Sequence, residues 1–121
     1  MNDTKIKKIV DDLVRIVDDM KAEDIRSFHV ADSNWLTEYV VVVGVKTPVH
    51  GKAVLESVKA FFNKLPADDD LFEHPRISGS PDSGWTVIDS NSIVVHCIAE
   101  DQRAYYAIDT LFESQGHVYH Y

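Results

Sequence analysis

The run Tyr39–Val45 (YVVVVGV) constrains the fold more than any other stretch of the sequence. Its β-branched side chains favour extended backbone, and a strand that is apolar on both faces is typical of the centre of a sheet covered on both sides. Thr47 and Pro48 follow, and they suit the N-cap and the first position of a helix. The sequence therefore predicts a central strand that leads directly into a helix ending near residue 65.

The apolar spacing of two other segments predicts two more helices. Over residues 4–20, apolar residues recur every three or four positions, as on one face of an amphipathic helix. Residues 100–114 carry a second such stripe. The inward positions expected on this last helix are Tyr105, Ile108, Leu111 and Phe112.

Four further segments are predicted to be strands. One covers residues 25–30. Residues 85–89 and 93–98 are joined by the turn Ser90-Asn91-Ser92, so they form a predicted hairpin. A weaker strand is expected around residues 71–78, where Pro75 suits an edge position.

The order of these segments predicts an α/β fold, in which one domain contains a mixed β-sheet of about five strands packed with three helices. A chain of 121 residues can bury a core without metals or disulfides. The domain is expected to span residues 1–121, with its core at about 10–114. The tail at residues 115–121 has no assigned partner.

The charge balance narrows the classes of partner. The chain has 20 acidic and 12 basic residues and a formal net charge of −8. Proteins that bind nucleic acid directly usually carry a basic face, so DNA is not an expected partner. An acidic domain suits a basic protein partner, although the same charge is also explained by solubility alone.

Cellular location follows from what the sequence lacks. The single cysteine, Cys97, allows no intramolecular disulfide, which favours reducing surroundings. The N-terminus turns acidic where a signal peptide would be apolar. No apolar run approaches the roughly 20 residues that span a membrane. We therefore expect a cytoplasmic protein with no membrane contact.

Catalytic chemistry is hard to assemble from these residues. His96 and Cys97 are neighbours on a predicted strand, so they point to opposite faces and cannot form a dyad. The glycine spacing at residues 79–84 lacks the lysine and the helix of a phosphate-binding loop. The six histidines and the acidic run at residues 68–70 supply no recognisable ligand set. No catalytic residue, cofactor or metal site is predicted.

The segment 85–89 instead presents a candidate binding surface. Strand alternation places Trp85, Val87 and Asp89 on one face and Thr86 and Ile88 on the other. Tryptophan is frequent at interface hot spots, and a nearby carboxylate would suit a basic partner. The pattern alone favours a core position for Trp85 and leaves the interface role open.

Two long segments carry a family resemblance. KAEDIRSFHVADSNWLTEYVVVVG, and SGWTVIDSNSIVVHCIAEDQRAYYAIDTLF further on, resemble the ribosomal silencing factor family, also called Iojap. The sequence departs from the family pattern at residues 43–46, at Val49 and at the turn 91–92. The matching positions are Lys21, Asp24, Ile25, Thr37, Glu38, Tyr39, Gly44, His50, Gly79, Trp85, Asp89, Val94, Val95, His96, Glu100, Arg103, Tyr105, Tyr106, Leu111 and Phe112.

The resemblance implies a function without enzymatic chemistry. Members of the family dock on the large ribosomal subunit through its protein number fourteen and block joining of the small subunit, which represses translation. Their fold is similar to that of nucleotidyltransferases without the catalytic residues. The alternatives are a non-ribosomal homodimeric adaptor and a nucleotidyltransferase-like enzyme, and a homodimer of the free protein is also compatible with silencing.

The resemblance and the charge together suggest a docking surface. We expect Trp85 to be its buried anchor and carboxylates around it to pair with Lys or Arg of the partner. Arg103 is expected to have a structural role, holding Glu100 or Asp89 in place. The partner-binding residues expected are Trp85, Asp89, Tyr39, Glu38, His96 and Glu100.

Overall fold

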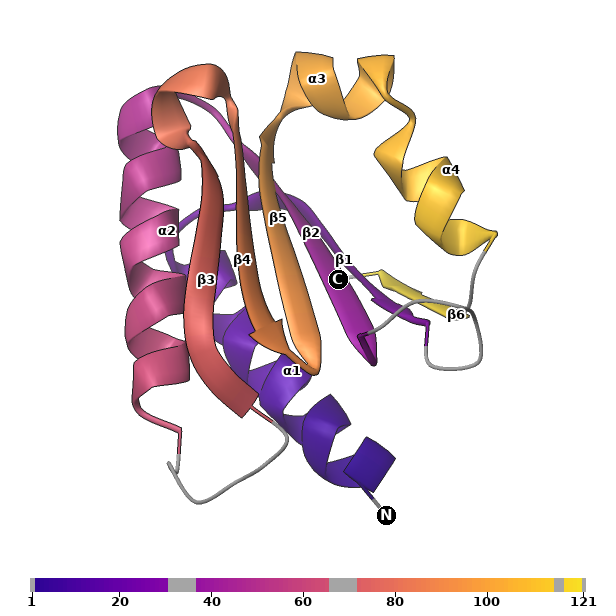
Figure 1. Cartoon of the computed structure of the whole chain (residues 1–121). Coiled ribbons are helices and arrows are strands. Elements are labelled where there is room, and N and C mark those ends of the chain that lie inside the picture. The colour runs from indigo at the N-terminus through magenta and orange to yellow at the C-terminus, as the bar shows by residue number, and fades with distance from the viewer. Residues whose placement is uncertain (1, 31–36, 66–71, 115–116, 121) are drawn as a thin grey trace.

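The computed structural model describes residues 2–30, 37–65, 72–114 and 117–120 (Figure 1). The fold is built on a six-stranded mixed sheet, whose strands lie in the order β3-β4-β5-β2-β1-β6. The parallel pair β2–β5 lies inside the sheet, and the other neighbouring pairs are antiparallel. The strands are β1 (Glu23–His29), β2 (Tyr39–Val45), β3 (Phe72–Ser80), β4 (Trp85–Asn91), β5 (Ile93–Ala99) and β6 (His117–His120).

The predicted central strand is confirmed. All seven residues of β2 are buried, because β5 and β1 flank the strand and side chains from helices cover both of its faces. The predicted helix after it is α2 (Pro48–Asn63), and Thr47 caps it by accepting a hydrogen bond from the backbone N–H of His50 at 3.0 Å. Helix α1 (Asn2–Asp19) packs beside α2.

The sheet divides the core into two layers (Figure 1). On one face, α1 and α2 bury an apolar cluster that includes Leu13, Val58 and Val41. On the other face, the short helices α3 (Glu100–Tyr105) and α4 (Ile108–Glu113) cover a smaller cluster around Phe28 and Val42. A single α/β domain with a mixed sheet is therefore confirmed.

The tail forms a sixth strand, one more than the sequence indicated. Strand β6 pairs antiparallel with β1, with Phe28 opposite Val118 and His29 opposite His117. This pairing could not be predicted from the sequence, because β1 and β6 are far apart along the chain and the tail has no apolar alternation of its own. The expected strand at 71–78 is β3, an edge strand paired with β4. Residue 71 and the acidic run at 68–70 lie outside the described residues.

The expected third helix is broken in two. Ala107 adopts a left-handed backbone conformation with φ of 50°, and this turn separates α3 from α4. The break shifts the helical phase, so a single stripe through Tyr105 and Leu111 does not form. Ile108 and Phe112 are buried as expected, whereas Tyr105 and Leu111 are exposed. No helix in the described part of the chain is long and apolar enough to cross a membrane.

Candidate functional site

The candidate surface lies on the sheet face that α3 and α4 cover only in part. In β4, Trp85, Val87 and Asp89 are partly exposed, while Thr86 and Ile88 are buried on the face that packs against α2. The predicted alternation along this strand is therefore confirmed. Because residues opposite each other in paired strands share a face, Trp85 lies beside Ile98, Val87 beside His96, and Asp89 beside Val94.

Trp85 is both a core residue and a surface residue. Its indole Nε1 donates a hydrogen bond to Nδ1 of His96 at 3.0 Å. One part of the ring packs on the cluster that contains Val42, Ile98 and Phe112. Its centroid also lies 5.4 Å from that of Tyr106. The indole is thus fixed in position with its only polar group already bonded, and its remaining exposed surface is apolar.

His96 is neutral under ordinary conditions. Burial lowers the pKa of His96 from 6.5 to about 4, because the charged imidazolium loses its water. Nδ1 accepts the hydrogen bond from Trp85, so the proton of the neutral ring is on Nε2. The ring also lies 5.5 Å from that of Phe112, between centroids. His96 therefore supports the indole rather than offering a charge to a partner.

Cys97 points to the opposite face of the sheet, as the sequence predicted. Its side chain is 1% exposed and lies in the cluster under α1 and α2. Burial raises the pKa of the Cys97 thiol to about 12. Because the thiolate is the reactive form of cysteine, this residue is a small buried hydrophobe and not a nucleophile.

Asp89, near the C-terminal end of β4, has partners of its own. Its carboxylate accepts hydrogen bonds from the backbone N–H of Asn91 at 2.9 Å and from Nη2 of Arg76 at 3.3 Å. Arg76 lies directly opposite on β3 and is mostly exposed. Sequence reasoning missed Arg76, because finding it required the register between β3 and β4.

Tyr39 does not belong to this surface, which corrects the expected set. It is 3% exposed and lies in the cluster under α1 and α2, on the opposite face from Trp85. The cause is register, since Tyr39 is opposite Ile93 in β5, one position away from the row that contains Val94. Its ring stacks on His29 at 4.6 Å between centroids.

Glu38 and Glu100 occupy two other places. Oε1 of Glu38 lies 2.9 Å from Nε2 of His29, next to the start of β2. Glu100 is exposed in the first turn of α3, at the opposite end of the sheet. The six expected residues thus do not form one patch: Trp85, His96 and Asp89 share a face, and Glu100 directly follows the end of β5.

Two tyrosines extend the surface beyond the expected residues. Tyr105 is 81% exposed and Tyr106 is 55% exposed, and their centroids are 4.8 Å apart in an edge-to-face arrangement. Tyr106 also contacts Trp85. We call Trp85, Tyr105 and Tyr106 the aromatic surface. The adjacent tyrosines were visible in the sequence, but the expected unbroken helix placed Tyr105 inward.

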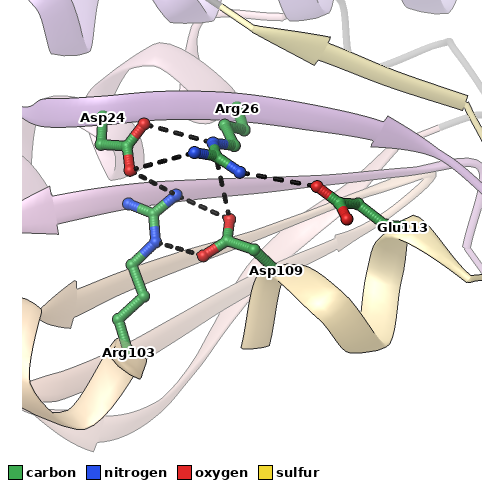
Figure 2. Close-up of polar contacts among 5 residues, drawn as sticks. All are labelled: Asp24, Arg26, Arg103, Asp109 and Glu113. Atoms are coloured by element: carbon green, nitrogen blue, oxygen red, sulfur yellow. Dashed lines mark hydrogen bonds and ion pairs between the residues drawn. The ribbon is translucent and has the colours of Figure 1, made fainter. Parts of the chain in front are cut away.

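An ion-pair network holds α3 and α4 on the sheet (Figure 2). Arg103 donates two hydrogen bonds to the Asp109 carboxylate, from Nε at 2.7 Å and from Nη2 at 2.8 Å. Nε of Arg26 on β1 lies 3.9 Å from Oδ1 of Asp109 and 3.2 Å from Oδ1 of Asp24. Nη1 of Arg26 lies 3.6 Å from Oε1 of Glu113. Arg103 therefore has the structural role expected of it, but its partners are Asp109 and, at 3.9 Å from Nη2, Asp24, and not Glu100 or Asp89.

A concave region separate from this surface lies at the carboxyl ends of the parallel strands β2 and β5. This hollow, of about 210 Å³, is lined by residues that include Thr47, Ser83 and Gln102. Within the described ranges, no group of three or more His, Cys, Asp or Glu side chains could hold a metal ion.

Comparison with known proteins identifies the relatives of this chain. A family model described as "Ribosomal silencing factor during starvation" matches residues 3–120. The ribosomal silencing factor RsfS of Bacillus subtilis is 24% identical over 112 residues, which cover 93% of this chain and 88% of the relative. RsfS of Halalkalibacterium halodurans is 25% identical over 99 residues, which cover 82% of this chain and 80% of the relative.

Solved structures show the same fold. A crystal structure of a protein from Chromobacterium violaceum is similar with a TM-score of 0.73 at 24% identity, covering 89% of this chain and 86% of that one. A second, from Bacillus halodurans, has a TM-score of 0.68 at 23% identity, covering 89% and 93%. The arrangement of helices and strands described above is therefore shared with proteins of low sequence identity.

Proposed function

The chain belongs to the ribosomal silencing factor family, whose members regulate translation without enzymatic chemistry, and from this premise we propose how it acts. It docks on the large ribosomal subunit through protein number fourteen of that subunit and sterically blocks joining of the small subunit. The place of action is then the cytoplasm. Because members of this family are not enzymes, the nucleotidyltransferase-like alternative raised by the sequence is excluded.

The aromatic surface is the single observation that supports the docking proposal most strongly. Trp85, Tyr105 and Tyr106 are in ring contact and partly or largely exposed on one side of the domain. Trp and Tyr are the residue types most enriched among interface hot spots. Because the hydrogen bond to His96 already fixes the indole, little side-chain entropy is lost when a partner covers Trp85.

Charge supplies the second argument. Asp89 lies on the same face as Trp85, and Glu100 and Asp101 stand in the first turn of α3. The whole chain carries a net charge of −8. Ribosomal proteins are generally basic, so this surface attracts such a partner and repels bare RNA phosphates. In this proposal Asp89, His96 and Glu100 border the anchor, while Tyr39 and Glu38 take no direct part.

The docking proposal is tested by co-sedimentation with isolated large ribosomal subunits at two salt concentrations. We expect the wild type to pellet with the subunits, and less so at the higher salt. Tyr105→Ala is the sharpest variant because Tyr105 is 81% exposed and its loss should not disturb folding. We expect it to weaken binding by roughly fivefold or more.

The matched control is Val49→Ala. Val49 is also 81% exposed, but it lies on α2, which covers the other face of the sheet. It should bind like the wild type. Equal binding by the wild type, Tyr105→Ala and Val49→Ala would show that Tyr105 takes no part in docking and that the docking surface lies elsewhere. A folded wild type that stays in the supernatant at low salt would overturn ribosome docking and favour the adaptor alternative.

Silencing itself requires a second experiment. Small subunits are added to large subunits that have been preincubated with the protein, and joined ribosomes are measured by sucrose-gradient centrifugation. We expect fewer joined ribosomes with the wild type and near-normal joining with Tyr105→Ala. If the wild type binds the large subunit but joining is unchanged, docking stands and the steric mechanism fails.

A further inference from the structure

The sheet face that carries Trp85 is bordered by β3, the edge strand (Figure 1). Residues opposite each other in paired strands share a face. On this face the register places Arg76 opposite Asp89, Ser78 opposite Val87, and Ser80 opposite Trp85. Two of these three β3 residues are small serines. Between residues 76 and 80, all of which the structure describes, Arg76 is therefore the only long side chain that β3 places on this face.

The Asp89 carboxylate is held in position by the backbone. Its Oδ1 accepts a hydrogen bond from the N–H of Asn91 at 2.9 Å. Asn91 has a left-handed φ of 74° at the turn between β4 and β5. An aspartate that bonds the backbone two residues further on is a common arrangement in turns. Oδ1 is therefore used by the turn, and Oδ2 is the oxygen that remains for a cation.

Arg76 is held much less firmly than Asp89. Its Nη2 donates a hydrogen bond to Oδ2 of Asp89 at 3.3 Å and lies 3.9 Å from Oε2 of Glu73. The Arg76 side chain is 70% exposed, and that of Asp89 is 37% exposed. The contact with Asp89 uses one nitrogen and one oxygen, without the two-fold geometry that makes arginine–carboxylate pairs strong. An exposed pair of this kind contributes little, so Arg76 leaves Asp89 at small cost.

A basic partner on this face competes with Arg76 for the same oxygen. Asp89 lies beside the partly exposed Val94 and shares its face with Trp85, the anchor of the proposed docking surface. Two cations at one carboxylate oxygen repel each other. A Lys or Arg of the partner therefore gains its full attraction to Asp89 only after Arg76 has moved away.

We propose that Arg76 is an internal competitor for Asp89 that limits the affinity of docking. In the free protein the Arg76 guanidinium occupies Oδ2 of Asp89, and a Lys or Arg of the ribosomal partner displaces it. The carboxylate stays in place during this exchange, because its other oxygen is bonded to the backbone of Asn91. The inference rests on the docking proposal and names one cationic contact within it.

The test is a titration of isolated large ribosomal subunits with each variant, in which co-sedimentation at low salt gives dissociation constants. Arg76→Gln removes the charge and keeps a polar side chain. We expect it to bind roughly two- to fivefold more tightly than the wild type, the range that corresponds to an exposed ion pair. Arg76→Lys keeps the cation and should bind like the wild type. Both variants should unfold at the same urea concentration as the wild type, because Arg76 is mostly exposed.

Arg15→Gln is the matched control for net charge. Arg15 is 78% exposed and pairs with Asp12 at 3.3 Å, so it resembles Arg76 in exposure and in ion-pair distance. It lies on α1, which covers the other face of the sheet. We expect Arg15→Gln to bind like the wild type. Equal tightening by Arg15→Gln and Arg76→Gln would be a general effect of charge and would overturn the proposal.

A second background shows whether Arg76 acts through Asp89. Asp89→Asn leaves no carboxylate to compete for, so Arg76→Gln should not tighten binding when it is added to this variant. The comparison is a double-mutant cycle of the wild type, the two single variants and the double variant. Tightening of the same size in both backgrounds would show that Arg76 acts by another route, and the proposal would be wrong.

The docking proposal and this inference fail in different ways. If the folded wild type stays in the supernatant at low salt, docking fails and the inference fails with it. If the wild type pellets and Arg76→Gln binds no more tightly, docking stands and the competition is absent. Weaker binding by Arg76→Gln would show that Arg76 itself contacts the partner, which overturns the inference and leaves docking intact.

Discussion

The indole Nε1 of Trp85 and the Nδ1 of His96 are joined by a 3.0 Å hydrogen bond across the β4–β5 pair. The bond exists only while Nδ1 has a free lone pair, so it requires neutral His96. Burial keeps the ring neutral by lowering its pKa to about 4. The residue that anchors the proposed docking surface is therefore held in place by a group that titrates in mild acid.

We predict that stability decreases between about pH 6.5 and pH 4. In this range His96 binds a proton in the unfolded chain but not in the folded one, so unfolding becomes easier as the pH falls. A difference of about 2.5 pKa units corresponds to a loss of roughly 3 kcal/mol when the pH has fallen through both values. Urea unfolding at pH 7 and pH 4.5 measures the change.

A histidine pair controls that measurement. His96→Gln removes the titrating ring and should flatten the dependence of unfolding free energy on pH. His74→Gln removes a histidine from an exposed position on β3 and should leave the dependence in place. If both variants lose stability in acid as steeply as the wild type, another group is responsible.

We also predict that Trp85→Phe destabilises the protein through one lost hydrogen bond. Phenylalanine keeps an aromatic ring on the cluster that contains Ile98 and Phe112, but it has no N–H for His96 Nδ1. An acceptor left without its partner in a buried setting costs about 1–3 kcal/mol. Chemical unfolding at pH 7 gives the value. A loss as small as that of Tyr105→Ala, expected within about 0.5 kcal/mol, would show that water replaces the bond.

We predict that the native protein resists thiol reagents. Cys97 is 1% exposed, and burial raises the pKa of its thiol to about 12. Modification should therefore require opening of the cluster under α1 and α2, and its rate should rise in step with unfolding when urea is added. Labelling followed by mass spectrometry measures this rate. Fast labelling without denaturant would contradict the buried position.

The sequence predicted those parts of the fold that depend on local pattern. The valine run of β2 and the Thr47-Pro48 signal for α2 are strong because every residue in them agrees with one structure. The alternation in β4 placed Trp85 and Asp89 on one face for the same reason. Ala107 carried no warning, since a left-handed alanine is set by tertiary contacts and not by local preference.

The candidate site was less accessible to sequence reasoning because it depends on register. Tyr39 is opposite Ile93 of β5, whereas Trp85 is opposite Ile98. Ile93 and Ile98 are an odd number of positions apart, so the two aromatic side chains lie on opposite faces of the sheet. The pairing of Arg76 with Asp89 and that of Arg103 with Asp109 also require contacts between separate elements.

The ion pair between Arg103 and Asp109 leads to the last prediction. Arg103 is 7% exposed, and Asp109 supplies both of its short hydrogen bonds. Asp109→Asn keeps the shape of the side chain but leaves a buried guanidinium without its main counter-charge. Loss of one partner of a buried pair typically costs about 3–5 kcal/mol, so we expect a decrease of that order in the free energy of unfolding.

The same variant connects the network to the aromatic surface. Asp109 is on α4 and Arg103 is on α3, beside Tyr105 and Tyr106, so loss of their contact should loosen α3 before the central sheet opens. Hydrogen exchange should then increase in residues 100–113 and remain slow in β2 and β5. Asp101→Asn, in the same helix but outside the network, is the matched control. Equal exchange in Asp109→Asn and the control would show that Phe112 and Ile108 alone hold the helices on the sheet.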